Sequence, residues 1–250
     1  MNIIFQDEYL IAINKPAGLL VHRSDIDKHE TQNAVQLLRD QLGRKIFPVH
    51  RLDKPTAGVL LFALNAEIAK QMMHAFMADG VKKTYLAVVR GHTVDNAIID
   101  YPLKEQQDKM TDAKARQDKA AQPAVTYYQR LADAELPIPV GRYSSCRYSL
   151  VQLHPKTGRK HQLRRHMKHI FHPIIGDTSH GDGVHNTFFR EQFGCRQLLL
   201  AATNLAFTHP YTGCPVQIHA GLDGGFSAII NALGWDLVFQ LKSASLEQAP

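Results

Sequence analysis

Short apolar runs and turn residues at the start of the chain predict β-structure. Residues 3–5 and 10–13 are apolar and flank the polar Gln6-Asp7-Glu8, which predicts a hairpin. The apolar run over residues 59–64 is bounded by turn residues and is typical of a strand buried on both faces. Residues 84–89, rich in β-branched and aromatic side chains, and the alternating residues 148–153 predict two further strands.

Helical periodicity appears in three segments. Val35, Leu38 and Leu42 recur at helical spacing, which predicts a helix within residues 31–42 that ends at Gly43. A second helix is expected from Asn65 to Gly80, and its predicted apolar face, which we interpret as core filling, comprises Ile68, Met72, Met73, Phe76 and Met77. The spacing of Leu163, Met167 and Ile170 predicts a short third helix that starts near Arg159.

Strands and helices alternate irregularly, without the glycine fingerprint of a dinucleotide-binding fold. The pattern predicts a mixed α+β fold in a single domain, residues 1–241, followed by a frayed polar tail, residues 242–250. Residues 102–122 hold nine charged side chains of both signs. We therefore expect an exposed charged loop over about residues 103–122.

Composition narrows the class of protein. The chain has 250 residues, of which 44% are hydrophobic, so it can form a core. Its longest apolar runs fall far short of the roughly 20 residues that cross a bilayer, and no secretory signal is readable. The three cysteines are widely spaced and form no CxxC pair. These features predict a cytoplasmic protein with no membrane partner.

Positive charge is concentrated in one segment. No Asp or Glu occurs in the 41 residues between Glu135 and Asp177. The segment holds eight cations and so accounts for the whole net charge of +6; they are Arg142, Arg147, Lys156, Arg159, Lys160, Arg164, Arg165 and Lys168. Such a stretch favours a nucleic acid as partner over an ordinary solvated face.

Most candidate chemistries find little support. Five histidines, His154, His161, His166, His169 and His172, lie close together, but no HExxH motif or nearby carboxylate completes a metal site. There is no GxSxG motif, and neither Cys146 nor Cys195 lies in a motif that would lower its pKa. Residues 157–160 could bind an anion but lack the spacing of a nucleotide-binding loop.

Asp53 is the strongest candidate for a reactive group. It lies just before the predicted buried strand, and His50, Arg51 and Lys54 are close to it in sequence. Cations around a partly buried carboxylate favour its charged form, which a nucleophile or base at neutral pH requires. A turn residue that hydrogen-bonds its own backbone is the simpler interpretation of the aspartate.

Four segments together resemble the motifs of RluA-type pseudouridine synthases in order and spacing. They are residues 14–18, residues 50–58, residues 83–91 and residues 155–164. The resemblance extends over about residues 3–220 and implies a pseudouridine synthase fold, with a mixed, largely antiparallel central sheet and helices and loops around a catalytic cleft. It also implies an enzyme that isomerises uridine in RNA without cofactor or metal.

The resemblance assigns roles to individual residues. Asp53 is similar to the catalytic aspartate, Arg51 to the arginine that fills the gap left by the flipped uridine, Tyr85 to the tyrosine that stacks on uracil, and Arg164 to the arginine that pairs with the aspartate. Whether the aspartate attacks the sugar, attacks the base or removes a ribose proton stays open. The further residues expected to contact RNA are His50, Leu163, Lys156, Arg159, Lys160, Arg165 and Lys168.

The later part of the chain suggests which RNA is modified. Residues 141–148, 173–182, 208–213 and 219–223 resemble family members that modify the acceptor-side stem of tRNA. The chain also opens on the catalytic domain, without the N-terminal module of many members that act on ribosomal RNA. We therefore expect tRNA as substrate and no obligate protein partner. The alternatives are a ribosomal RNA substrate and a non-catalytic RNA-binding or chaperone module.

Overall fold

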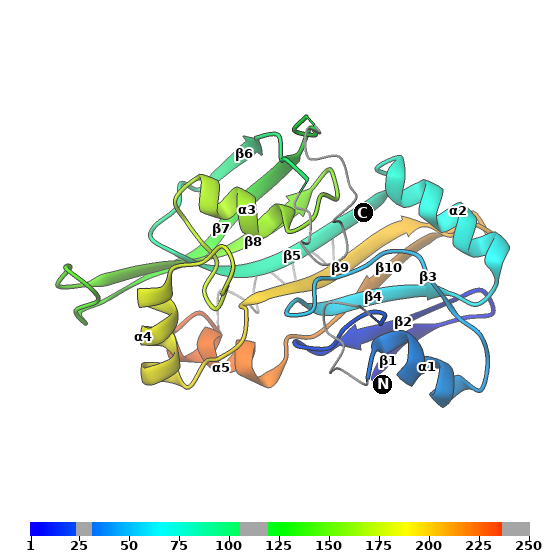
Figure 1. Cartoon of the computed structure of the whole chain (residues 1–250), viewed down its shortest axis with the longest axis horizontal. Coiled ribbons are helices and arrows are strands. Elements are labelled where there is room, and N and C mark those ends of the chain that lie inside the picture. Colours follow the sequence, from blue (N-terminus) through cyan, green and yellow to red (C-terminus); the bar gives the residue numbers. More distant parts are fainter. Residues whose placement is uncertain (24–31, 106–119, 237–250) are drawn as a thin grey trace.

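A ten-stranded mixed sheet forms the centre of the molecule (Figure 1). The computed structural model describes residues 1–23, 32–105 and 120–236. Eight strands lie side by side in the order β1 (Ile3–Gln6), β2 (Leu10–Lys15), β4 (Ala57–Ala63), β9 (Leu200–Thr208), β5 (Val81–Arg90), β8 (Cys146–Pro155), β7 (Val125–Leu136) and β6 (Asn96–Asp100). Two more, β3 (Phe47–Pro48) and β10 (Pro215–His219), pair with β4 and β9. Among the named strands of the described residues, only β4 and β9 pair in parallel, which confirms a mixed, largely antiparallel sheet.

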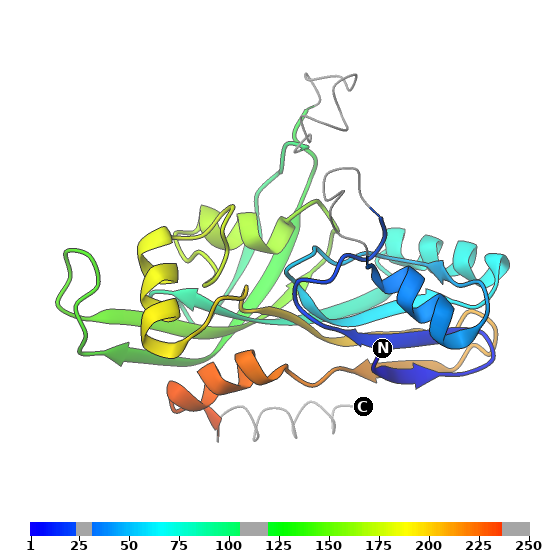
Figure 2. The ribbon, with the colours of Figure 1, turned by 60° about the horizontal axis from the view of Figure 1, so that its bottom comes forward.

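Helices cover both faces of the sheet. The side chains of α1 (Ala34–Leu42) and α3 (Gln162–His169) pack on one face, and those of α2 (Ala66–Met77), α4 (Gly183–Phe193) and α5 (Gly224–Ala232) pack on the other. Successive side chains of β2 point to opposite faces of the sheet. Leu10 and Ala12 pack with α2 on one face, whereas Ile11 and Ile13 pack with α1 on the other. Figure 2 shows α3 above the sheet and α5 below it.

Local sequence signals located the first strands and helices correctly. The predicted hairpin is confirmed as β1 and β2, and every residue of β4 is buried. Helix α1 ends at Gly43, which has a left-handed φ of 64°, and the Asn65 side chain caps α2 by accepting the Ile68 N–H. These residues predict element ends because they satisfy backbone groups that a helix leaves unpaired.

Two expectations about helix faces were wrong. Met72 is buried, but Met73 and Met77 are 48% and 74% exposed, because the core side of α2 is formed by Ile68, Ala69 and Met72. The methionines are therefore only partly core filling. Helical spacing places Arg164 about 100° round the helix from the core-facing Leu163, which predicts a position at the border of the buried and exposed faces of α3, but Arg164 is buried. Its burial is possible because carboxylates surround its guanidinium group, as described below.

Helix α3 begins later than predicted because a fixed turn precedes it. The Gln162 side-chain oxygen accepts hydrogen bonds from the Arg159 N–H at 3.0 Å and from the Thr157 hydroxyl at 2.7 Å. His161 adopts a left-handed φ of 54° just before the first helical residue. The turn thereby connects the end of β8 to α3 in a single defined geometry.

A close approach of two backbones joins the halves of the sheet. Strand β4 pairs with β9 only through Ala57 and Gly58, opposite Ala201 and Ala202. A Cβ atom on Gly58, whose φ is 109°, would overlap the carbonyl oxygen of Ala202. Only glycine fits this crossing point, which lies just after the loop that carries Asp53.

Parts of the expected domain lie outside the described residues. At the ends of the expected charged loop, buried Leu103 pairs with Gln122, while residues 106–119 are not described. The tail, residues 242–250, is likewise outside the described part, and the domain boundaries 1–241 stay a prediction. Within residues 1–23, 32–105 and 120–236, no helix has the length and apolar character needed to span a membrane.

Candidate active site

Asp53 lies in a short, well-anchored loop between β3 and β4. Leu52 is buried in the core beneath α1, and the Thr56 N–H donates to the Asp53 carbonyl oxygen at 3.0 Å. The Gly18 N–H donates to the Lys54 carbonyl at 2.9 Å, so residues 14–18 also hold this loop. The Asp53 side chain remains 22% exposed and can therefore contact a ligand.

Arg164 connects Asp53 to a second carboxylate. Its Nε and Nη2 donate to the two oxygens of Asp177 at 2.7 Å each, and its Nη1 lies 3.3 Å from Asp53 Oδ2. Burial alone would lower the pKa of Arg164, but its hydrogen bonds and the negative charge of Asp177, with a smaller effect from Asp53, raise it. The guanidinium group is thus held charged and fixed beside Asp53.

Asp177 was absent from the residues predicted from sequence. Its side chain accepts hydrogen bonds from the Arg164 guanidinium and from the backbone N–H groups of Ser179 and His180. Burial would raise the pKa of Asp177, but these donors lower it below its ordinary value. One available signal was its place at the end of the acid-free segment, as the first anion after eight cations.

Two histidines extend the cluster. His161 Nε2 lies 3.9 Å from Asp53 Oδ2, and His161 Nδ1 lies 3.0 Å from His180 Nε2. Burial lowers the pKa of His180 to about 4, although the charge of Asp177 opposes the shift. Burial also lowers the pKa of His161, against the effect of Asp53. The pair thereby connects Asp53 to the segment between α3 and α4, in which His180 lies, a role that the sequence did not indicate.

Tyr85 lies in the middle of β5, on the face between α1 and α3. Its side chain packs against the core beneath each of these helices. Burial and then the negative charge of Asp53 raise the pKa of Tyr85 above its ordinary value, so it keeps its proton at neutral pH. The structure therefore brings Asp53, Tyr85 and Arg164 together from three separate elements.

Lys15 is a buried cation beneath the Asp53 loop. Its Nζ donates to the carbonyl oxygens of Pro16, Leu19 and Lys54 at 2.9, 2.8 and 3.1 Å. Burial lowers the pKa of Lys15 to about 7, against the effect of Asp53. Residues 14–18 resemble a family motif, but the sequence assigned no role to Lys15, because the groups that accept its hydrogen bonds are backbone carbonyl oxygens.

Other predicted site residues have different surroundings. Arg51 is exposed beside Asp53 in sequence. The His50 ring stacks on Phe76, and its Nε2 accepts the Leu61 N–H at 2.9 Å. Burial lowers the pKa of His50 to about 3, so it is not one of the cations that we expected around Asp53. Leu163 is a core residue that packs in the same cluster as Tyr85.

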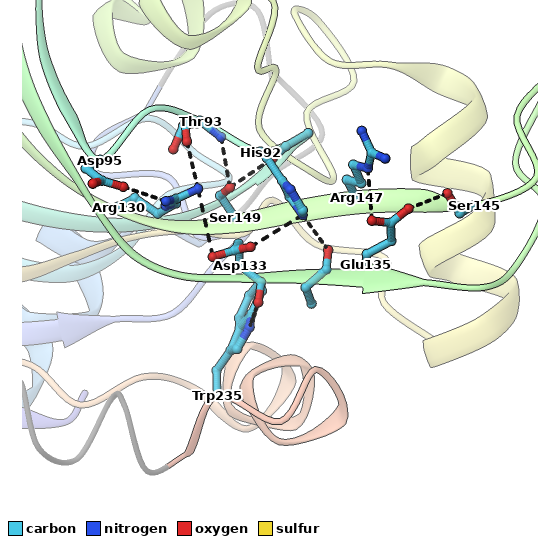
Figure 3. Close-up of polar contacts among 12 residues, drawn as sticks. His92, Thr93, Asp95, Arg130, Asp133, Glu135, Ser145, Arg147, Ser149 and Trp235 are labelled. Carbon is cyan, nitrogen blue, oxygen red and sulfur yellow. Dashed lines mark hydrogen bonds and ion pairs between the residues drawn. The ribbon is translucent and has the colours of Figure 1, made fainter.

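The cations of the acid-free segment divide into two groups. Lys156, Arg159, Lys160, Arg165 and Lys168 follow the end of β8 and helix α3, near Arg164. Arg142 and Arg147 lie instead at the far end of the β7–β8 hairpin, which projects beyond α4 (Figure 1). Figure 3 shows Arg147 paired with Glu135, at 3.2 Å, within a polar network of that hairpin. Only the first group lies beside the candidate site.

The five histidines of residues 154–172 have separate surroundings. His166 is buried, with Nδ1 2.9 Å from the Thr126 hydroxyl and Nε2 3.0 Å from the Tyr101 carbonyl, so it connects α3 to neighbouring segments. Among the residues whose positions are described, no three His, Cys, Asp or Glu side chains are grouped so that they could hold a metal ion.

Comparison with known proteins identifies the family of this chain. The family described as RNA pseudouridylate synthase matches residues 9–169, which include Asp53, Tyr85 and Arg164. The chain belongs to this family. Its members are isomerases, and the expected enzyme class is therefore confirmed.

Full-length relatives and solved structures support the assignment. The chain is 55% identical to tRNA pseudouridine synthase C of Vibrio cholerae over 94% of this chain and 96% of that protein. It is 54% identical to the Pasteurella multocida protein of the same name, over 95% and 98% of the two chains. The structure of human RNA pseudouridylate synthase domain containing 4 superposes with a TM-score of 0.70 at 27% identity, over 93% of both chains. The expected pseudouridine synthase fold is thus confirmed.

Proposed function

We propose that this protein converts a uridine on the acceptor-stem side of tRNA to pseudouridine, and that Asp53 is the group that acts on the target nucleotide. Support for tRNA comes from relatives named tRNA pseudouridine synthase C, which share more than half of their residues with this chain along nearly their whole length. The cations around α3 supply the charge that an RNA backbone requires.

The reaction needs no redox partner and no net water. The bond between uracil N1 and ribose C1′ breaks, the base turns, and a bond between C5 and C1′ forms. N1 gains a proton and C5 loses one, so that substrate and product are isomers. Asp53 serves as nucleophile or base in this sequence, a role that its partly exposed carboxylate can perform.

The neighbouring side chains prepare the substrate and the carboxylate. A uridine in a stem must leave the base stack before it can react, and the exposed Arg51 fills the vacated space. Tyr85 offers its ring to the uracil from the floor of the site. Arg164 is a positioning residue, because Asp177 fixes the guanidinium group that contacts Asp53.

The observation that carries the proposal is the 3.3 Å contact between Asp53 and the buried Arg164 in a family member. Asp53→Asn retains the shape of the side chain and leaves the Arg164–Asp177 pair intact. We expect it to abolish pseudouridine formation on tRNA while the Kd for tRNA changes less than about threefold, since one carboxylate contributes little to phosphate binding. Asp95→Asn, at an exposed ion pair on the β7 side, is the matched control and should retain full turnover.

Substrate choice is tested separately. Pseudouridine mapped in cellular RNA with and without the protein should disappear at a tRNA position in the acceptor-side stem. Loss at a ribosomal position instead would favour the ribosomal RNA alternative. Full turnover of Asp53→Asn would remove the assignment of the aspartate, and tRNA binding without any product from the wild-type protein would favour the non-catalytic alternative.

A further inference from the structure

Helix α3 ends with an exposed aromatic ring at a position where helices usually have glycine. The Phe171 N–H donates to the Lys168 carbonyl at 3.0 Å, and the His172 N–H donates to the Met167 carbonyl at 2.9 Å. This pair of hydrogen bonds is a Schellman motif, in which the residue after the cap adopts a left-handed conformation. Here that residue is Phe171, with a φ of 65°.

The side chain of Phe171 makes little contact with the core that could offset the unfavourable backbone conformation. Phe171 is 79% exposed, which is the largest exposed fraction among the exposed large hydrophobic residues that the structure describes. A phenylalanine at positive φ is unfavourable, and an exposed one buries almost no apolar area. Unfavourable backbone conformations of this kind are concentrated at functional sites. The ring therefore points to a ligand.

The backbone around Phe171 is held rigidly by β5. His172 Nδ1 donates to the Arg90 carbonyl at 2.8 Å, and the Arg90 N–H donates to the Pro173 carbonyl at 3.0 Å. Arg90 Nη2 also lies 3.4 Å from the Phe171 carbonyl. Because the ring stands on a fixed support, binding against it costs little conformational entropy.

An open pocket of about 440 Å³ lies beside the ring. Its lining includes the apolar Phe171 and Pro173, together with Lys168, His180 and the ion pair of Arg90 with Asp182, at 2.5 Å. Burial keeps His180 neutral, so two cations against one carboxylate leave the pocket positive. Lys168 is exposed and has no ion-pair partner among the residues that the structure describes. An aromatic face beside an available cation suits a nucleotide, with its flat base and its phosphate.

The pocket adjoins the candidate active site. His180, which lines it, contacts His161 at 3.0 Å, and His161 lies 3.9 Å from Asp53. Lys168 follows Arg164 by one turn of α3, about 6 Å along the helix axis. A nucleotide in the pocket would therefore be a near neighbour of the nucleotide at Asp53.

We propose that Phe171 stacks on the base of a nucleotide that flanks the target uridine, and that Lys168 contacts its phosphate. This inference rests on the proposed function, since it assumes an RNA substrate at Asp53. Removal of the uridine from its stack leaves a flanking base without its stacking partner, and a rigid aromatic ring takes the place of that partner irrespective of base identity.

Phe171→Gly separates binding from folding. Glycine suits a φ of 65°, so the variant should be at least as stable as the wild-type protein to heat, while its Kd for tRNA should rise by about 5- to 100-fold. Phe171→Tyr should retain wild-type affinity. Tyr211→Ala is the matched control, because it removes a ring that is 66% exposed in the turn between β9 and β10, and should leave Kd unchanged.

An abasic scan of the RNA identifies the base that contacts the ring. One abasic nucleotide beside the target uridine should weaken binding to the wild-type protein but cause no further loss with Phe171→Gly. Wild-type affinity of Phe171→Gly, additive losses, or a lower melting temperature of this variant would each overturn the inference. If the wild-type protein forms pseudouridine in those cases, the proposed function stands; if it forms none, the proposed function itself has failed.

Discussion

Arg164 and Asp177 form a buried, two-point ion pair, with 2.7 Å between each donor nitrogen and its carboxylate oxygen. The third nitrogen of the same guanidinium group, Nη1, faces Asp53. Asp177 thereby determines where Arg164 lies, and Arg164 determines the electrostatic surroundings of Asp53. A residue that was not among the predicted site residues thus supports the candidate reactive group.

The first prediction concerns this support. Asp177→Asn removes the carboxylate that balances the buried positive charge of Arg164. The free energy of unfolding should therefore fall by about 3 kcal/mol. The rate of pseudouridine formation at saturating tRNA should fall at least about tenfold, because the guanidinium group is drawn away from its position beside Asp53. Urea unfolding and single-turnover kinetics measure the two effects.

The exposed pair of Asp95 with Arg130 provides the control for this experiment. Asp95→Asn should cost at most about 1 kcal/mol and leave the rate unchanged, because water screens the pair. If Asp177→Asn turned over tRNA at the wild-type rate, Asp177 would have no positioning role.

A second prediction concerns Gly58, where β4 and β9 cross. Gly58→Ala places a Cβ atom against the Ala202 carbonyl oxygen, so we expect a loss of at least about 3 kcal/mol or no folded protein. Gly213→Ala shares a positive φ of 72° but meets no atom within 4 Å, and should cost only about 1 kcal/mol. Equal losses in urea unfolding would show that backbone conformation, and not the close approach, requires Gly58.

Features that depend on neighbouring residues could be predicted from the sequence, whereas contacts between distant residues could not. Hairpins, buried strands and capped helices depend on neighbouring residues, so that Gly43 and Asn65 located helix ends correctly. The resemblance to a known family located Asp53 and Arg164, which the fold brings together across 111 positions of sequence. Asp177 and Lys15 lie in segments that resemble family motifs, residues 173–182 and 14–18, but their roles were missed because their partners are distant side chains or backbone carbonyls.

Burial of charge was also hard to anticipate. The apolar spacing of α3 places Arg164 at the border between the buried and exposed faces of the helix. Its burial is favourable because the carboxylates of Asp177 and Asp53 lie beside its guanidinium group. Phe171 is the opposite case. Its apolar side chain suggests core, but the end of α3 turns it outward in a left-handed conformation.

A third prediction follows from histidines that stay neutral in the fold. Burial lowers the pKa of His50 to about 3 and that of His180 to about 4, from an ordinary value of 6.5. Between pH 6.5 and pH 4 the unfolded chain therefore binds more protons than the folded protein. The free energy of unfolding should fall as the pH falls through this range, by up to about 1.4 kcal/mol per pH unit for each such histidine.

His50→Gln tests the contribution of one group. Glutamine offers an oxygen that can accept the Leu61 N–H in place of His50 Nε2, and it does not titrate. Urea unfolding at several pH values should therefore give a shallower dependence on pH for this variant than for the wild-type protein. Identical slopes would mean that His50 does not contribute to acid sensitivity.

The fourth prediction concerns how the two groups of cations contribute to RNA binding. Lys156 and Arg159 are exposed in the turn between β8 and α3, near the candidate site, whereas Arg142 and Arg147 lie in the distant hairpin. The affinity for tRNA should fall steeply with salt, because phosphate contacts release counterions. Neutralising Lys156 and Arg159 to glutamine should lower the slope of log Kd against log salt concentration by about 1 for each phosphate that is no longer neutralised.

The paired substitution Arg142→Gln and Arg147→Gln removes the same total charge from the hairpin and should leave the slope nearly unchanged, since both residues lie at the far end of the β7–β8 hairpin, away from Asp53. Kd measured from about 50 to 200 mM salt distinguishes the two variants. If both pairs lowered the slope equally, the RNA would extend along the hairpin, and the binding surface would include the whole acid-free segment. A difference confined to Lys156 and Arg159 would place the RNA backbone along the end of β8 and α3, where it must pass to present a uridine to Asp53.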